Sequence, residues 1–253
     1  MINALNAERV KLLSTRSPYW CVGVVVVLAL GAAAITGSAV SGGAGTSSSE
    51  IAYMSLLGLS SFGLLVLMIM AVLAITNEYR FGTIRTTFQA IPKRWIVLLA
   101  KAGVFGGLAF IATVVLAVAA LLLVRVIGGS GAGLELGDSG VMRQIWGMPI
   151  IAVLFVLIGL GVGASVRHTA GAIVIVLIWD LAVESIVAVL PRVGTHVAPF
   201  LPFRNATRFL AGDNSDMAGG GYHWGVYGSL VYFAVFAIAI FVIGIVVVER
   251  RDA

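Results

Sequence analysis

The sequence has few charged residues and a single cysteine. Asp, Glu, Lys and Arg make up 11% of its 253 residues, against about 25% in a typical soluble domain. The lone Cys21 excludes an intramolecular disulfide. Basic residues outnumber acidic ones by 16 to 11, but they are scattered between apolar blocks. This composition disfavours a soluble domain, a disulfide-stapled secreted module, a disordered chain and a nucleic-acid binder.

The sequence also lacks the motifs of two kinds of active site. A Walker A loop needs glycines that cradle phosphate and a lysine that reaches it, and none of the three lysines stands in that context. The three histidines lie in separate segments without metal-ligand spacing. We therefore predict a chain that is not an enzyme, with no catalytic residue, no metal site and no cofactor of its own.

Long apolar blocks are what the sequence has in abundance. The mean hydropathy is +1.08, and 60% of the residues are hydrophobic. Blocks of about 18 or more apolar residues are typical of membrane-spanning helices, since lipid offers no hydrogen-bond partner to a bare backbone. The predicted fold is an all-α integral membrane protein, with residues 1–253 forming one six-helix transmembrane bundle. Its spans are expected at about residues 18–40, 52–76, 96–124, 146–166, 171–190 and 223–248.

The basic residues predict an orientation for this bundle. Eleven of the sixteen fall on one side of the bundle, and Arg125, Arg143, Arg192, Arg204 and Arg208 fall on or near the other. By the positive-inside rule, the N- and C-termini are predicted to be cytoplasmic, in a plasma or inner membrane. A cleaved signal peptide is disfavoured, because the first apolar run exceeds the ~7–15 residues of a signal sequence.

The connection between the second and third predicted spans is amphipathic. Apolar residues recur there at spacings of three, four and three, at Phe81, Ile84, Phe88 and Ile91. This spacing places them on one face of a short helix, expected over residues 78–91 at the cytoplasmic surface. Two interpretations remain open: an interfacial anchor for lipid headgroups, or a docking element pressed against a soluble partner.

The residues of this connection carry a resemblance to a known family. A span is followed by Glu78-Tyr79-Arg80-x-Gly82-Thr83-Ile84-Arg85 and then Pro92-x-Arg94, and the chain enters the next span through Lys101. In this E-x-x-x-G-T core, its place between spans two and three, and the six-span topology, the whole chain resembles the permease subunits of type-two ABC exporters.

The resemblance implies partners and a role for the connection. In that family this segment is the coupling helix, which docks into a cleft of an ABC ATP-binding subunit. ATP and Mg²⁺ are then bound by that separate chain, and a second permease subunit, identical or related, completes the pathway. The residues that match the coupling position are Glu78, Tyr79, Arg80, Gly82, Thr83 and Arg85.

Two segments outside the spans also carry apolar residues, and residues 191–222 are too apolar for a free loop. Residues 1–16 mix apolar and charged positions, as expected for an interfacial helix, which is either a simple anchor or, by the resemblance, part of the docking cleft. Residues 191–222 resemble the family's re-entrant pair of short helices, an external cap that closes the exit. The cap residues of interest are Phe200, Phe203, Arg204 and Arg208.

Two acidic residues stand inside the fifth predicted span. Asp180 and Glu184 are spaced i,i+4 on one helix face, and carboxylates at this depth are expected to face a cavity, an interface or a cation. One interpretation is that they line the pathway, favouring cationic or zwitterionic substrates or binding a proton. The other is structural ion pairing with Arg125, or with one of the cap-side arginines Arg192, Arg204 and Arg208.

The function predicted from these features is that of an exporter permease subunit. It would move an amphipathic small molecule, drug, peptide or lipid outward, driven by ATP hydrolysis on the partner. The competing interpretation is an ATP-independent ion-coupled secondary transporter or channel that uses Asp180 and Glu184. A membrane scaffold or sensor subunit is a third alternative. Dependence on a cytosolic ATPase separates the first two.

Overall fold

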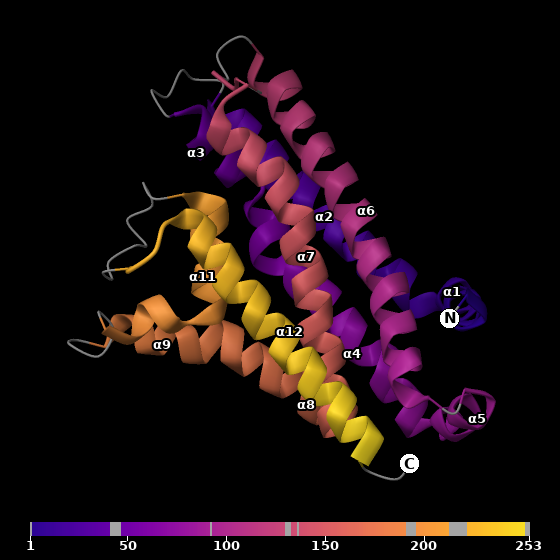
Figure 1. Cartoon of the computed structure of the whole chain (residues 1–253). Coiled ribbons are helices and arrows are strands. Elements are labelled where there is room, and N and C mark those ends of the chain that lie inside the picture. The colour runs from indigo at the N-terminus through magenta and orange to yellow at the C-terminus, as the bar shows by residue number, and fades with distance from the viewer. Residues whose placement is uncertain are drawn as a thin grey trace.

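The structure, a computed structural model, describes residues 2–40, 47–91, 93–129, 133–135, 137–190, 196–212 and 222–250. These residues form helices and connections, and no strand occurs among them (Figure 1). In chain order the elements are α1 (Ile2–Ser14), α2 (Arg16–Val40), α3 (Ser48–Ser55), the π-helix η1 (Gly58–Gly63), α4 (Leu64–Arg80), α5 (Thr83–Ala90), α6 (Arg94–Gly128), α7 (Ser139–Val166), α8 (Thr169–Leu177), the π-helix η3 (Ile178–Val183), α9 (Glu184–Val189), the 3-10 helix η4 (Ala198–Phe200), α11 (Pro202–Ala211) and α12 (Val226–Arg250).

Six helices in the described part of the chain are long and apolar enough to cross a membrane. The prediction of an all-α protein with six membrane-spanning helices is confirmed at this level. The spans run over Arg16–Val40, Gly58–Arg80, Arg94–Gly128, Ser139–Val166, Thr169–Val187 and Val226–Arg250.

Two predicted span boundaries differ clearly from the observed ones. The second span was expected from residue 52, but it begins at Gly58, because α3 is a separate helix whose first turn is capped by the Ser47 hydroxyl. The fourth was expected from residue 146 and begins at Ser139, because Asp138 caps its polar first turn by accepting backbone N–H groups at 2.8 and 3.1 Å. Hydropathy windows miss such polar turns.

Helix α7 is the centre of the bundle and packs against α4, α6 and α12. Glycines let its neighbours approach closely. A Cβ on Gly159 would meet the carbonyl oxygen of Met68 in α4, and one on Gly161 would lie 2.5 Å from that of Ile240 in α12. Close backbone approach of this kind is how membrane helices gain packing energy. Gly159 and Gly161 therefore lie where α7 meets the backbones of α4 and α12.

Replacing glycines in α6 and α7 tests this packing. We expect Gly159→Ala to lower the free energy of unfolding by about 1–3 kcal/mol, because backbone atoms of α4 block the new methyl group. Gly107→Ala in α6 is the matched control, since nothing lies within 4 Å of its Cβ position, and alanine favours a helix by up to about 1 kcal/mol. Thermal denaturation in detergent should show opposite shifts, and equal shifts would contradict the packing described.

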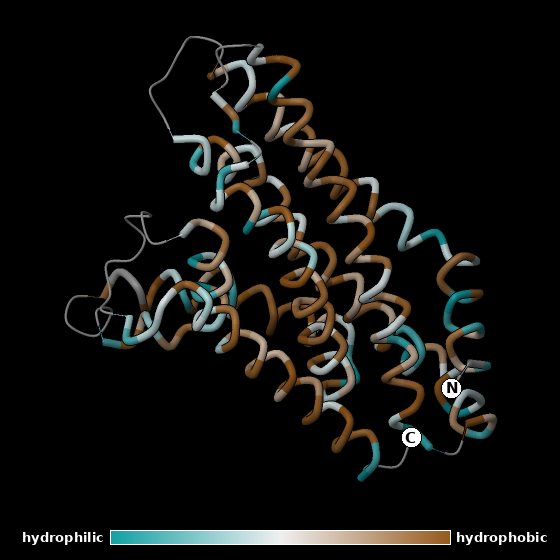
Figure 2. The backbone as a smooth tube through the Cα atoms, turned by 45° about the horizontal axis from the view of Figure 1, so that its top comes forward, coloured by the Kyte–Doolittle hydropathy of each residue, from teal (hydrophilic) through white to brown (hydrophobic). Residues whose placement is uncertain are grey.

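The two ends of the bundle carry different short helices. Helix α1, helix α5 and the C-terminal end of α12 lie together where α6 begins, and we call this the α5 end (Figure 1). A hydrogen bond of 3.1 Å from the Arg94 guanidinium to the Val248 carbonyl joins α6 to α12 there. Helix α3 lies at the other end, with the α6–α7 connection. Hydrophobic residues follow the spanning helices and hydrophilic ones gather in α1 and at helix ends (Figure 2).

The fifth span is a helix with a π-helical segment inside it. Helix α8 packs against α4 and α7, then the chain passes through the π-helix η3 and continues as α9, which reaches η4 (Figure 1). Only 17% of its apolar window is buried, so most of its surface is open to lipid or to another chain. Asp180 lies in the π-helical segment η3, and Glu184 begins α9.

Candidate functional site

The amphipathic connection is split into two pieces. A single helix was predicted over residues 78–91, but α4 continues through Arg80, and α5 covers only Thr83–Ala90. The break falls at Gly82, whose φ of 70° lies in the left-handed region that favours glycine. Glu78, Tyr79 and Arg80 therefore belong to the spanning helix. Pro92, expected to end the connection, lies outside the described residues.

The predicted apolar face of this connection is shorter than expected. Ile84 of α5 is buried and Phe88 is half-buried, as the spacing indicates. Phe81 precedes α5 and is 70% exposed, because the turn at Gly82 rotates it away from the other two. The Arg94 guanidinium stacks over the Phe88 ring at 5.2 Å and covers the outer edge of α5.

A buried charge network holds the α5 end together. Lys101 of α6 is 1% exposed, and its ammonium nitrogen donates to Glu8 of α1 at 2.7 Å and to Glu78 of α4 at 2.8 Å. A third bond of 3.2 Å reaches the Ala74 carbonyl oxygen. Charges removed from water need such partners, because an unpaired one would cost several kcal/mol. The network thus fixes α1 against two membrane-spanning helices.

Lys11 of α1 completes the network from the outside. Its ammonium nitrogen lies 2.9 Å from Glu8 and 2.8 Å from the same Glu78 oxygen that Lys101 contacts. It also lies 3.4 Å from the Thr87 hydroxyl of α5. Burial lowers the pKa of the Lys11 ammonium, but its hydrogen bonds and Coulombic attraction to Glu78 and Glu8 outweigh this and raise the pKa above its usual range. Lys11 therefore stays protonated until strongly alkaline pH, and its pairing stabilises the fold throughout the physiological range.

The remaining predicted coupling residues face outward or support the turn. Arg80 and Arg85 are both exposed, on the two sides of the turn. The Thr83 hydroxyl donates to the Glu78 carbonyl at 3.5 Å, which bridges the break. Tyr79 lies beneath the Arg167 guanidinium, at 5.1 Å from ring to Cζ. Within this motif Glu78 is therefore buried in the bundle, whereas Arg80 and Arg85 are exposed.

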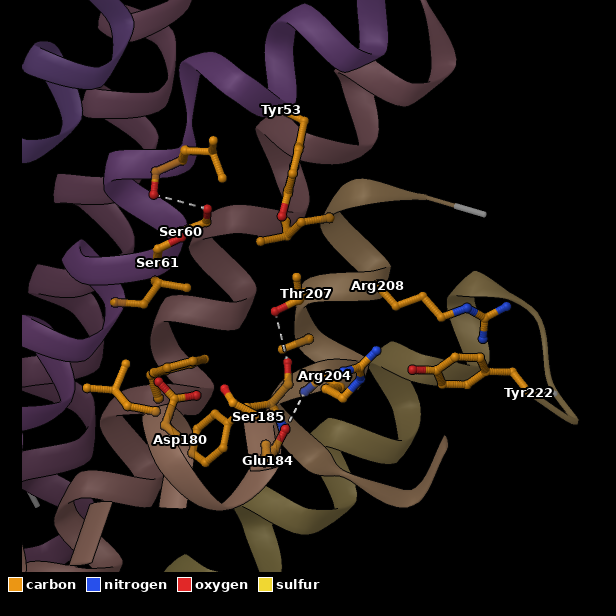
Figure 3. A pocket seen from close by; sticks show the side chains of 17 residues that line it. Tyr53, Ser60, Ser61, Asp180, Glu184, Ser185, Arg204, Thr207, Arg208 and Tyr222 are labelled. Carbon is orange, nitrogen blue, oxygen red and sulfur yellow. Dashed lines mark hydrogen bonds between the residues drawn. The ribbon is translucent and has the colours of Figure 1, made fainter. Parts of the chain in front are cut away.

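A cavity of about 310 Å³, lined by polar and apolar side chains, lies in the other half of the bundle (Figure 3). The two π-helices face it: Ser60 and Ser61 of η1 and Asp180 of η3 are among its lining residues. Tyr53 of α3 and Glu184 of α9 also line it. The cavity thus brings both predicted intramembrane acids to one place.

Glu184 is held by the end of a helix. Its carboxylate accepts the backbone N–H groups of Phe203 at 2.9 Å and of Arg204 at 2.7 Å, in the first turn of α11. The residue before this helix, Leu201, has no side-chain oxygen to cap it. Glu184, which is 3% exposed, supplies that cap from another segment and places negative charge at the positive end of the helix dipole.

Two of the arginines proposed as ion-pair partners, Arg204 and Arg208, line the same cavity as the two acids. Arg125 is exposed near the end of α6, with no contact to either acid in the described structure. Arg208 donates to the Trp224 carbonyl at 2.9 Å and to Ser229 at 3.0 Å, and lies over the Tyr222 ring. In Figure 3 the Arg204 side chain extends toward Arg208 and away from Asp180. Arg192 is outside the described residues.

The predicted cap region contains two short helices, η4 and α11. Its residues 191–195 and 213–221 lie outside the described structure. Phe203 is buried against Phe155 of α7, with ring centroids 5.2 Å apart, whereas Phe200 is 49% exposed. Helix α11 therefore packs as part of the bundle, against α7 and α12, and forms one wall of the cavity.

Sequence reasoning missed Glu8 and Lys11 as parts of a site. The signal that could have found the network is Lys101, a lysine within a membrane span, which needs an acidic partner. The fold and these sites define a polytopic helical membrane protein with a buried charge network at the α5 end and a separate cavity that contains two acids. No protein-family model matches the chain, and a search of curated proteins gives no match.

Proposed function

We propose that the chain is the permease subunit of an ATP-driven exporter. Separate ABC ATP-binding subunits, which carry ATP and Mg²⁺, would dock at the α5 end, and a second permease subunit would complete the pathway. The basic residues concentrated at this end favour a cytoplasmic location for it and for both termini. The cargo class that fits the cavity is an amphipathic small molecule.

The observation that carries the proposal is the buried network at Lys101. It joins α1 to α4 and α6, and through Lys11 it reaches α5. A force applied to the exposed face of α5 can therefore pass through the 3.4 Å hydrogen bond between Thr87 and Lys11 into the ionic contacts that join α1 to two membrane-spanning helices. A simple lipid anchor would have no need of this connection to the bundle.

Exposed arginines give the test, because they can be removed without disturbing the network. We expect the tagged wild type, purified from its native membranes in mild detergent, to carry a Walker-type ATPase detectable by mass spectrometry and by ATP hydrolysis. The double variant Arg80→Ala/Arg85→Ala should lose at least 90% of this activity, because about two charge-assisted contacts to the partner disappear.

The control is Arg16→Ala/Arg250→Ala. It removes the same charge from exposed positions at the same end of the bundle and should retain the ATPase. Purification without any ATPase, or equal losses in the two variants, would overturn the exporter proposal.

A second candidate function rests on Asp180. This carboxylate lines a cavity within the membrane-spanning region, as expected for the ion site of a secondary transporter. The two candidates differ in their energy source. Uptake or release by reconstituted chain alone, driven by an imposed ion gradient and abolished by Asp180→Asn, would support the ion-coupled transporter instead.

A further inference from the structure

The cavity in Figure 3 is built from the two irregular stretches of the membrane-spanning helices. Within the described residues, π-helix occurs only in η1 and η3, and both line this cavity. A π-helix gives up regular α-helical hydrogen bonding and recurs at functional sites in proteins. Two such segments, from spans far apart in sequence, meet at one place, which is a sign of a binding site rather than of helix packing.

Several polar groups around this cavity make no hydrogen bond within the described structure. They are the carboxylate of Asp180, the Ser61 hydroxyl and the Tyr53 hydroxyl. In Figure 3, Tyr53, Ser60 and Ser61 approach the cavity from one side, and Asp180 approaches from the other. Polar groups at membrane depth require partners, so a ligand or water must supply them when the protein is embedded.

The other charged residues that line the cavity are Glu184, Arg204 and Arg208. Glu184 caps α11 through both carboxylate oxygens, Arg208 donates to Trp224 and Ser229, and the Arg204 side chain extends away from Asp180 (Figure 3). Asp180 is therefore the acid in this lining that is left to meet a ligand. The remaining lining includes apolar side chains from α4, α7, η3 and the connection before η1, namely Leu64, Phe155, Leu181 and Leu57.

We propose that this cavity binds an amphipathic amine, with its ammonium group on Asp180 and its apolar body against the surrounding leucines and Phe155. Hydroxyl oxygens of Ser61 and Tyr53 are placed to accept further N–H bonds. The volume, about 310 Å³, suits a small organic cation rather than a polymer or a two-chain lipid. This inference rests on the proposed function only in that the amine would be the exporter's cargo.

The test uses a matched pair of fluorescent compounds and the purified full chain. Dansylcadaverine carries a primary ammonium group, and its N-acetyl derivative has the same dansyl group without the charge. Binding is followed by energy transfer from tryptophan to dansyl in neutral-detergent micelles, with empty micelles subtracted. We expect wild type to bind the amine at least about tenfold more tightly than the acetylated compound, the value of one charge-assisted hydrogen bond.

The variant Asp180→Asn should abolish this preference, since it keeps the side-chain shape but removes the charge. Glu249→Gln, an exposed acid at the end of α12, is the control and should keep the preference. Equal binding of the two compounds to wild type would overturn the proposal, and this comparison does not depend on a variant that folds. A preference that survives Asp180→Asn would overturn it as well.

Failure of this inference is distinct from failure of the exporter proposal. If an ATPase co-purifies but the chain shows no preference for the amine, the exporter proposal stands and the proposal that its cargo is an amine is contradicted. If the chain prefers the amine but no ATPase co-purifies, the binding-site proposal stands and the exporter proposal is contradicted.

Discussion

Replacing Lys101 with methionine is expected to destabilise the protein by about 3–5 kcal/mol, which is enough to prevent folding in most detergents. The ammonium group of Lys101 contacts Glu8 and Glu78, and all three side chains are at least nine-tenths buried. Methionine fills a similar volume, but Lys11 is then the one cation left in the network to pair with the carboxylates of Glu8 and Glu78. The uncompensated charge, rather than lost packing, is the reason for the expected effect.

Size-exclusion chromatography after a heating series measures this effect directly. Lys93→Met is the matched control, because Lys93 is exposed just before the same helix, and the same replacement there should change stability by less than about 0.5 kcal/mol. Lys101→Met combined with Glu78→Gln removes one charge of each sign and should recover part of the loss. A Lys101→Met protein as stable as the Lys93→Met protein would show that the network contributes nothing.

For the mechanism, the important point is that α1 and α5 both contact the charge network that joins α4 to α6. Glu78 stands at the end of α4 and Lys101 in the second turn of α6, so both helices meet at one ammonium group. A tilt of α5 that pulls on Lys11 changes the position of Glu78 and hence of α4. In the proposed exporter, this is the step that turns ATPase closure into movement of the bundle.

Hydropathy was sufficient to predict the six spans, because a bilayer imposes one simple requirement on length and apolarity. It was insufficient where hydrogen bonds decide the outcome. The start of α7 depends on the Asp138 cap, and the end of α4 depends on Gly82 adopting a positive φ. The contact between Glu8 and Lys101 joins residues 93 positions apart, and no local pattern indicates such a pairing.

The prediction for Asp180 and Glu184 shows the same limit. Their spacing placed both acids on one face, and the structure brings both to one cavity. Charge alone suggested arginine partners, yet Glu184 binds backbone N–H groups of α11. A signal was present at Leu201-Pro202, a helix start without a capping side chain, but the sequence does not say which distant residue supplies the cap.

Replacing Glu184 with alanine is expected to cost about 2–5 kcal/mol, because two buried backbone N–H groups at the start of α11 lose their acceptor. Glu184→Gln retains one side-chain acceptor oxygen but turns an amide donor toward the other N–H group. The stability of the Glu184→Gln protein should therefore lie between those of the wild type and the Glu184→Ala protein. Ser185→Ala, at the neighbouring exposed position of α9, is the control and should have little effect.

Hydrogen exchange localises the effect of Glu184→Ala. Amides in the first turn of α11 should lose protection first, while those of α7 at the bundle centre keep theirs until global unfolding. This pattern separates the two intramembrane acids, since Asp180→Asn should leave the protection of α11 unchanged. If Asp180→Asn exposes α11 as much as Glu184→Ala does, both acids are structural, and the cavity loses the one charge assigned to a ligand.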